Sequence, residues 1–238
     1  MNNLENKVII ITGGSKGIGR VTALRLAKQN ARLVLASRKI DDLMKIKEEL
    51  QLPDDRILLV EADVSNEEDC SSIVNQAVEK FGRVDVLINN AAQFNRSKVI
   101  DLDLNDFDRV WKTNVRGVIA MTQRVLPHMI NQNEGTILNI SSTSGKRGYV
   151  TGAAYAASKF ALNGFTECLL REVRENNIRV LTISPSMVDT RVKNEDELKN
   201  SGKGVYMRAE DVADSILLCL NLPQRALIKD IEIWGTNP

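Results

Sequence analysis

The stretch ITGGSKGIGR, residues 11–20, lies between an apolar run typical of a strand and a stretch with helical periodicity. Gly13 allows backbone angles that other residues rarely adopt. Gly17 and Gly19 allow the backbone to approach a pyrophosphate and the helix to pack close to the sheet. A helix that begins near Gly17 directs its free N–H groups and its dipole at an anion. The spacing is T-G-x-x-x-G-x-G, so a purely structural turn is the alternative, but the strand-turn-helix context favours a dinucleotide-binding loop.

Outward from this loop, apolar β-rich runs alternate with helical patterns along the chain. The first six runs are almost continuous in Val, Ile and Leu, which is typical of strands covered on both faces. This alternation predicts one α/β domain over residues 1–238, a Rossmann fold with a doubly wound parallel sheet of about seven strands. The predicted strands cover residues 7–12, 31–37, 56–62, 84–89, 135–141, 178–184 and 226–234, and the longer predicted helices cover 19–30, 66–81, 105–130 and 153–175.

The composition excludes several classes of function. With 32 basic and 31 acidic residues the net charge is +1, so no strong field attracts the chain to nucleic acid or to an anionic membrane. Three scattered cysteines, Cys70, Cys168 and Cys219, argue against a disulfide framework or a zinc site and suit a reducing cytosol. The carboxylates show no metal-like spacing, and the first apolar run is too short for a signal sequence or a membrane span. We therefore expect a cytoplasmic, metal-free protein.

One polar segment, residues 189–208, interrupts the alternation after the sixth predicted strand. An insertion beyond the carboxyl end of a strand is where a substrate lid would lie. The sequence favours a lid over about 189–206, and a surface loop is the alternative.

The residues at the end of the second predicted strand decide which dinucleotide the loop would bind. An NAD site usually has an acid there, about 20 residues beyond the loop, to accept a hydrogen bond from the ribose. This chain has Ser37, Arg38 and Lys39 instead, and Lys16 in the loop can supply another cation. A hydroxyl beside a guanidinium suits a 2′-phosphate. The pattern therefore favours NADP(H), although each cation alone could be a solvated surface charge.

Two further segments end predicted strands on the same side of the sheet. Asp63 is placed to meet an adenine amino group with Val64 against its ring, and it could also cap the next helix. INNAA, residues 88–92, offers small side chains beside which a cofactor could lie, although paired asparagines are also ordinary turn residues.

The stretch YAASK, residues 155–159, places a tyrosine and a lysine on one face of a helix. An ammonium within about 4–6 Å favours the phenolate and lowers the pKa of a phenol. Such a phenol can give a proton to a carbonyl oxygen or take one from an alcohol. The pair Tyr155 and Lys159 is common by chance, so alone it is a weak signal; Tyr149 has no such lysine and is expected to form a pocket wall.

With the glycine loop, NNA (89–91), NISS (139–142) and YAASK in this order and spacing, the chain resembles the short-chain dehydrogenase/reductase family along nearly its whole length. The resemblance implies the strand order 3-2-1-4-5-6-7. It also implies that Ser142 holds the substrate oxygen, Tyr155 is the proton donor, Lys159 activates it, and Asn114 holds a water in a proton relay. The residues that we expect to bind the cofactor are Gly13, Ser15, Lys16, Gly17, Ile18, Gly19, Ser37, Arg38, Asp63, Val64, Asn90, Ala91, Tyr155, Lys159, Pro185, Val188 and Thr190.

The expected function is that of an NADPH-dependent reductase of a ketone or aldehyde, or the reverse oxidation. A poorly active NADP(H)-binding regulator is the alternative, because Ala92 and Ser186 replace glycines that are usual in the family. The overall pattern is also similar to 3-oxoacyl-carrier-protein reductases. However, Asn133 and Asn176 stand where those relatives tend to be basic, which disfavours an acidic carrier protein and favours a small carbonyl substrate. The helices at 105–130 and 153–175 resemble those that form dimers and tetramers in the family, so a homo-oligomer is expected.

Overall fold

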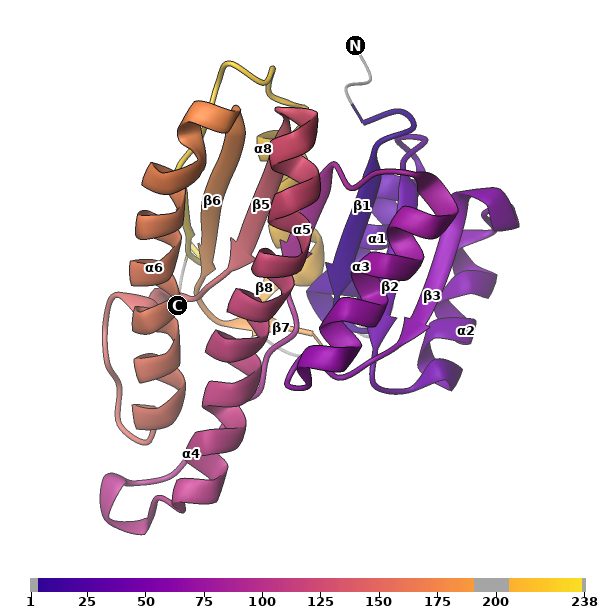
Figure 1. The fold of residues 1–238 in the computed structure, drawn as a ribbon. Coiled ribbons are helices and arrows are strands. Elements are labelled where there is room, and N and C mark those ends of the chain that lie inside the picture. Colours follow the sequence, from indigo (N-terminus) through magenta and orange to yellow (C-terminus); the bar gives the residue numbers. More distant parts are fainter. Residues whose placement is uncertain (1–3, 191–205, 237–238) are drawn as a thin grey trace.

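The computed structural model describes residues 4–190 and 206–236 and places a parallel sheet at the centre of the chain (Figure 1). The strand order is β3-β2-β1-β4-β5-β6-β9, which confirms the predicted order and the doubly wound Rossmann architecture. Each apolar run becomes a strand because both of its faces are covered, so every residue of β1 is buried. The strands are β1 (Val8–Thr12), β2 (Arg32–Ser37), β3 (Ile57–Glu61), β4 (Val86–Asn89), β5 (Gly135–Ile140), β6 (Ile178–Pro185) and β9 (Asp230–Ile233).

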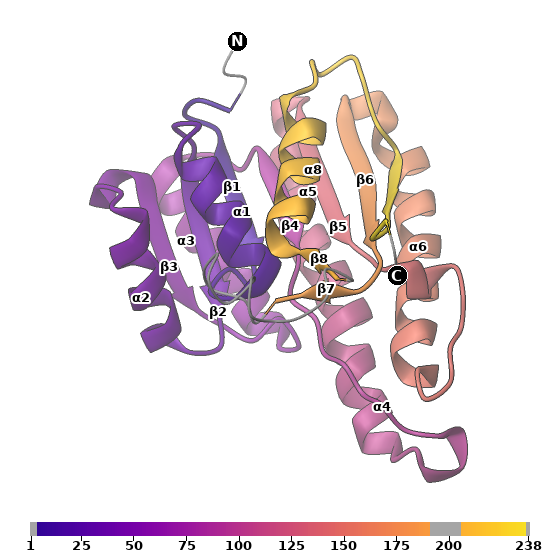
Figure 2. The same ribbon diagram turned by 180° about the vertical axis from the view of Figure 1, so that it is seen from behind.

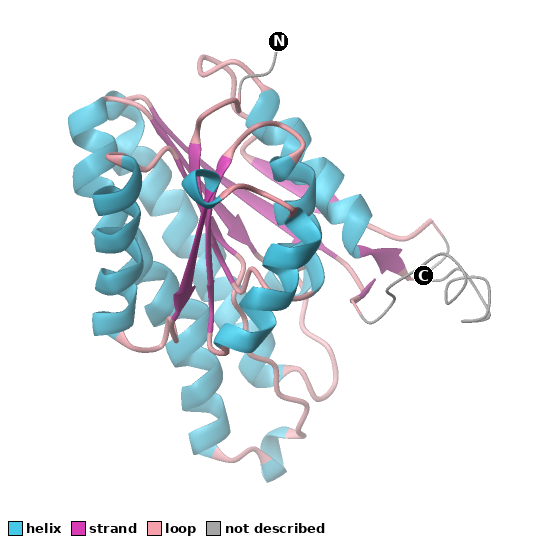
Figure 3. Cartoon of the chain, turned by 90° about the vertical axis from the view of Figure 1, so that its right-hand side faces the viewer, coloured by secondary structure: helices cyan, strands magenta, loops and turns pink. Residues whose placement is uncertain are grey.

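Helices cover both sides of the sheet, as Figure 3 shows. Successive side chains of a strand point to opposite faces, so Ile9 and Ile11 pack against α1, α2 and α8, while Val8 and Ile10 face the side that α3, α5 and α6 cover. Figure 2 shows α1, α2 and α8 from the side that is hidden in Figure 1. The helices are α1 (Gly17–Ala27), α2 (Ile40–Leu50), α3 (Glu67–Phe81), α4 (Leu104–Trp111), α5 (Val118–Gln132), α6 (Ala153–Val173) and α8 (Ala209–Asn221).

The predicted single helix over 105–130 is wrong in one respect. A π-helical turn, Lys112–Gly117, separates α4 from α5, and α4 extends beyond the carboxyl edge of the sheet at the bottom of Figure 1. The turn contains the buried Asn114, whose side chain bonds to a neighbouring loop and to α6. Wide turns of this kind are frequent at functional sites. Hydrophobic periodicity does not reveal them, because α4 and α5 continue the pattern on both sides.

The predicted lid over 189–206 lies mostly outside the described residues. Its two ends are described and lie side by side, since Val188 pairs with Met207 and Asp189 with Arg208. These two-residue strands are β7 (Val188–Asp189) and β8 (Met207–Arg208). Within the described ranges, no helix has the length and apolar character that crossing a membrane requires.

That the chain forms a homo-oligomer stays a prediction.

Candidate active site

The glycine loop has the backbone that the sequence predicts. Gly13 and Gly17 have φ values of +64° and +52°, and α1 begins at Gly17. An L-residue is strained at both positions. A Cβ on Gly19 would overlap the carbonyl oxygen of Gly13 and would lie 2.6 Å from Nδ2 of Asn90. The missing side chains therefore keep the N-terminus of α1 open and close to β1.

Two polar side chains hold this loop from the end of β4 and from β1. Asn90 donates from Nδ2 to the carbonyl oxygens of Thr12 (2.9 Å) and Gly13 (3.0 Å). The hydroxyl of Thr12 accepts from the backbone N–H groups of Asn90 and Ala91, both at 3.1 Å. Sequence reasoning missed Thr12, whose position directly before Gly13 in the T-G pair was the available signal. The side chain of Asn90 thus holds the glycine loop in place, in addition to the cofactor-binding role that the resemblance implies.

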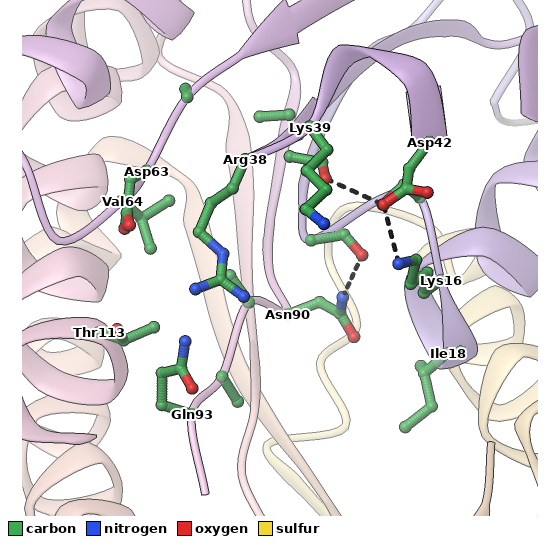
Figure 4. Close-up of a pocket in the computed structure, with 18 of the residues that line it drawn as sticks. Lys16, Ile18, Arg38, Lys39, Asp42, Asp63, Val64, Asn90, Gln93 and Thr113 are labelled. Atoms are coloured by element: carbon green, nitrogen blue, oxygen red, sulfur yellow. Dashed lines mark hydrogen bonds and ion pairs between the residues drawn. The ribbon is translucent and has the colours of Figure 1, made fainter. Parts of the chain in front are cut away.

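A cavity of ≈ 600 Å³ extends from this loop along the carboxyl ends of β1 to β4 (Figure 4). Most of the predicted cofactor residues line it, whereas Gly19, Pro185, Val188, Tyr155 and Lys159 do not. Asp42, Gln93 and Thr113 line it without having been predicted. The predicted residues that line it are Gly13, Ser15, Lys16, Gly17, Ile18, Ser37, Arg38, Asp63, Val64, Asn90, Ala91 and Thr190.

The positive charge at this cavity differs from the sequence expectation. Lys16 forms an ion pair with Asp42 of α2 (Nζ to Oδ2, 2.8 Å), and this hydrogen bond lowers the pKa of the Asp42 carboxyl. Lys16 is therefore not a free second cation. Arg38 extends into the cavity and, among the described residues, has neither an ion pair nor a side-chain hydrogen bond (Figure 4). Beside it, the hydroxyl of Ser15 donates to that of Ser37 at 2.9 Å and ties the loop to the end of β2.

Asp63 follows β3 and takes part in the turn that leads into α3. Its carboxylate accepts from the N–H of Ser65 at 2.9 Å, and its own N–H donates to Asp69 at 2.8 Å. The helix cap itself is Asn66, whose side chain accepts from two backbone N–H groups. Asp63 and Val64 both face the cavity, so the turn role and an adenine contact remain compatible.

At the carboxyl ends of β5 and β6, the predicted catalytic side chains converge. Ser142 lies two residues beyond the end of β5, and its side chain interacts with that of Tyr155 and lowers the pKa of the phenol. Its hydroxyl also accepts from the N–H of Ser144 (3.1 Å) and lies 3.4 Å from the carbonyl oxygen of Pro185. Lys159 is 2 % exposed, and its Nζ lies 5.7 Å from the centre of the Tyr155 ring. The site thus combines the hydroxyls of Ser142 and Tyr155 with the amine of Lys159. The phenol of Tyr155 can exchange a proton with the oxygen atom of a bound substrate.

The pKa of Tyr155 contradicts the sequence expectation. Burial raises it to about 12, and the side chain of Ser142 opposes this rise. The ammonium does not lower it, because Nζ of Lys159 donates to the carbonyl oxygen of Ile140 (2.7 Å) and lies over the ring, not at the hydroxyl. Burial lowers the pKa of Lys159 itself to about 8. The spacing of four residues predicts their proximity correctly but not these two effects of burial.

Asn114 is fully buried beside the catalytic helix. Its Oδ1 accepts from the N–H of Gln93 (2.7 Å), and its Nδ2 donates to the carbonyl oxygen of Gln93 (2.9 Å) and to the hydroxyl of Ser158 (3.0 Å). Both amide protons are thus used within the protein. Ser158 in turn donates to the backbone carbonyl of Tyr155 at 2.7 Å. The side chain of Asn114 therefore fixes the loop after β4 and α6, and the water relay stays a prediction.

The family can be assigned by comparison with known proteins. A family model described as short chain dehydrogenase matches residues 7–201. The chain belongs to the short-chain dehydrogenase family. It is 35% identical over 250 residues to an NADP-dependent 3-hydroxy acid dehydrogenase of Schizosaccharomyces pombe, covering 100% of this chain and 95% of the relative.

Solved structures of short-chain dehydrogenases have the same fold. A 3-ketoacyl-(acyl-carrier-protein) reductase from Brucella melitensis complexed with NADH is 31% identical, with a TM-score of 0.87 and 98% of both chains covered. A metagenomic short-chain oxidoreductase in complex with NADP is 26% identical, with a TM-score of 0.86, covering 99% of this chain and 100% of that one.

Two departures from the usual family pattern are tolerated by the backbone. Ala92 and Ser186 are not among the described residues with positive φ. A Cβ at these positions is therefore not strained. The replacement of the family glycines gives no conformational reason to expect an inactive short-chain dehydrogenase.

The buried amine of Lys159 makes stability depend on pH. Its pKa falls from 10.5 in the unfolded chain to about 8 in the folded one. Between these values the unfolded chain binds the extra proton, so the free energy of unfolding rises with pH. Relative to Lys159→Met, the wild type should gain about 2 kcal/mol from about pH 8 to about pH 9.5. Urea unfolding of both proteins measures the difference, and a pH-independent difference would contradict the lowered pKa.

Proposed function

We propose that the protein is an NADP(H)-dependent oxidoreductase that reduces a ketone or aldehyde to an alcohol, or catalyses the reverse reaction. The observation that carries this proposal is the convergence of Ser142, Tyr155 and Lys159 at the carboxyl edge of the sheet, beside the groove of the glycine loop. Ligands of open α/β sheets bind at this edge. A protein that only binds the cofactor would not need the buried amine of Lys159 against the phenol ring of Tyr155.

The groove fits a phosphorylated dinucleotide on three counts. The glycine loop approaches α1 so closely that a Cβ at Gly19 would overlap the carbonyl oxygen of Gly13, and the N-terminus of α1 faces a pyrophosphate position. Arg38 offers a guanidinium that no carboxylate of the described ranges neutralises, directly after β2, where a 2′-phosphate would lie. The NADP named for the S. pombe relative and for the metagenomic structure supports this assignment, whereas the Brucella reductase was solved with NADH.

The reduced nicotinamide supplies a hydride when it is bound. The chain's own residues supply the rest: Ser142 holds the carbonyl oxygen, and the phenol of Tyr155 gives that oxygen a proton. The amine of Lys159 is held against the phenol ring, 5.7 Å from its centre, by its hydrogen bond to the carbonyl oxygen of Ile140. The side chains of Ser142 and Tyr155 interact, so the negative charge that develops on the carbonyl oxygen meets two hydroxyl donors in a partly buried site.

The names of the relatives narrow the substrate class. One is named for a 3-hydroxy acid and another for a 3-ketoacyl group, so in both the reacting carbon lies two bonds from a carboxyl carbon. We extend this to the present chain: its substrate is a small compound with a 3-oxo or 3-hydroxy group. The free acid carries a negative charge near the reacting carbon, and the acyl ester does not.

The test is consumption of NADPH, followed by its absorbance, with a panel of ketones and aldehydes that includes 3-oxo acids and 3-oxo esters. We expect turnover with at least one 3-oxo compound. If the protein binds NADPH but oxidises it no faster with any carbonyl than without one, the catalytic proposal is wrong and the chain is a binding protein.

A further inference from the structure

The segment after β4, residues 93–97, is an extended strip fixed to the protein at every second residue. The backbone N–H of Gln93 donates to the side chain of Asn114, and the backbone carbonyl oxygen of Gln93 accepts from that same side chain. Asn95 donates to Asp106 of α4 at 2.9 Å, and the N–H of Ser97 donates to the carbonyl oxygen of Thr151 at 3.1 Å. The partly buried residues are thus those at odd positions, and this strip has a defined conformation.

The far end of this strip is held by backbone contacts. The bond from Ser97 to Thr151 is joined by a parallel bridge between Ser97 and Gly152, which lies directly before α6. Because both ends and the middle are fixed, the side chains at the even positions, Phe94 and Arg96, are presented together on the exposed side.

Phe94 and Arg96 are stacked beside the proton donor. The Phe94 ring meets the Tyr155 ring edge to face, with 4.9 Å between their centres. The guanidinium carbon of Arg96 lies 5.3 Å from the centre of the Phe94 ring. Phe94 is 46 % exposed, so this pair forms an open wall of the space next to Tyr155. A planar cation on an aromatic face keeps its hydrogen-bond donors free at the edge.

The charge of Arg96 has no partner in the part of the chain that the structure describes: no carboxylate lies within ion-pair distance, and its guanidinium donates no hydrogen bond. By contrast, Arg147, on the segment that carries Tyr149, is paired with Glu232 (3.6 Å) and lies over Trp234. The field of Arg96 also reaches Tyr149, where it opposes the rise that burial causes in the pKa of that phenol. An unpaired guanidinium that lies on Phe94 and whose field reaches the phenol of Tyr149 is a site for an anion.

We propose that Arg96 binds a carboxylate of the substrate, so that the physiological substrate is an oxo or hydroxy acid and not its neutral ester. This inference rests on the proposed function, because it places the acid group beside the carbonyl that Tyr155 protonates. The strip at 93–97 sets the position of the guanidinium, and Phe94 holds its plane. The alternative is that Arg96 only covers the Phe94 ring, a surface contact without a role in recognition.

The test compares acids with matched neutral esters. The substrates are acetoacetate against ethyl acetoacetate and 4-oxopentanoate against its ethyl ester, each with NADPH. The proteins are the wild type, Arg96→Ala, Arg96→Lys and, as a control for lost surface charge, Arg171→Ala, which removes an exposed cation from the far part of α6. Thermal melting of each variant checks that the fold is kept.

We expect Arg96→Ala to raise KM for the acids about 10- to 100-fold, with kcat and the KM of the esters changed about 2-fold or less. For Arg96→Lys, KM for the acids should lie between the values of the wild type and Arg96→Ala. Lysine keeps the positive charge but lacks the planar pair of donors of a guanidinium. Arg171→Ala should match the wild type. Equal changes for acid and ester, or no change, would overturn the inference. A wild type that reduces only the esters overturns it and leaves the proposed function standing. Turnover of neither member of any pair also overturns it, while the wider carbonyl panel decides the proposed function.

Discussion

Tyr155→Phe is expected to lower kcat by about 10²- to 10⁴-fold, the usual contribution of a positioned proton donor. The substitution removes the hydroxyl that interacts with the side chain of Ser142 and leaves the ring that packs against Phe94. The carbonyl oxygen then has a single donor and no proton source. Since neither the glycine loop nor Arg38 is touched, the affinity for NADPH should stay within about 2-fold of the wild type. Turnover is measured by NADPH absorbance, and binding by the enhancement of NADPH fluorescence.

Tyr149→Phe is the matched control, because it removes a hydroxyl from the neighbouring tyrosine. Tyr149 is 41 % exposed, and its ring lies against Gly152, not on Ser142. Its loss should change kcat by no more than a few fold. A Tyr155→Phe protein as active as the wild type on the best substrate would show that the proton comes from another group, and the assignment of Tyr155 would have to be abandoned.

The architecture could be predicted from sequence because its signals are local and redundant. Every central strand is a short apolar run with turn residues on both sides, and parallel strands covered on both faces require such runs. The glycines of the first loop are an equally direct signal in the sequence, since Gly13 and Gly17 adopt the positive φ that glycine allows. The strand order needed the family resemblance, because no local pattern states which strand lies next to β1.

The electrostatics of the site could not be predicted because they depend on contacts between distant segments. Lys16 has its partner, Asp42, in α2 and not in the glycine loop. The amine of Lys159 bonds to Ile140 at the end of β5 and is almost completely buried. A sequence shows that a tyrosine and a lysine share a helix face, but burial decides which form of each is favoured.

The conformation of the strip at 93–97 could not be predicted from the sequence. Its alternation of fixed and exposed residues depends on partners in α4 and in the π-helical turn, Asp106 and Asn114. No local pattern in the sequence shows that these two residues contact the strip. An arginine without an ion pair is likewise recognised only once its surroundings are known, because every charged residue of a sequence has many candidate partners.

Changing the end of β2 is expected to reverse the cofactor preference. In Ser37→Asp/Arg38→Leu, the ratio of kcat/KM for NADPH to kcat/KM for NADH should fall by about 100-fold or more. Two causes act together: the 2′-phosphate loses a charge-assisted contact with Arg38, and a carboxylate at position 37 repels it. The same carboxylate can accept a hydrogen bond from the ribose 2′-hydroxyl of NADH. Ser15, which donates to the hydroxyl of Ser37 at 2.9 Å, can donate to the new carboxylate as well, so the loop should keep its place.

Lys45→Ala controls for the loss of positive charge in this region, because Lys45 is an exposed residue of α2 that does not line the cavity. The ratio should stay close to that of the wild type in this variant, which separates contact with the phosphate from a general effect of charge. Steady-state kinetics with both cofactors at a fixed carbonyl concentration give the ratio. A wild type that already prefers NADH, or a double variant with an unchanged ratio, would show that Arg38 does not bind the 2′-phosphate. Because Lys16 is neutralised by Asp42, it is a weaker substitute for the lost guanidinium than its place in the loop implies, and the effect of removing Arg38 should be correspondingly large.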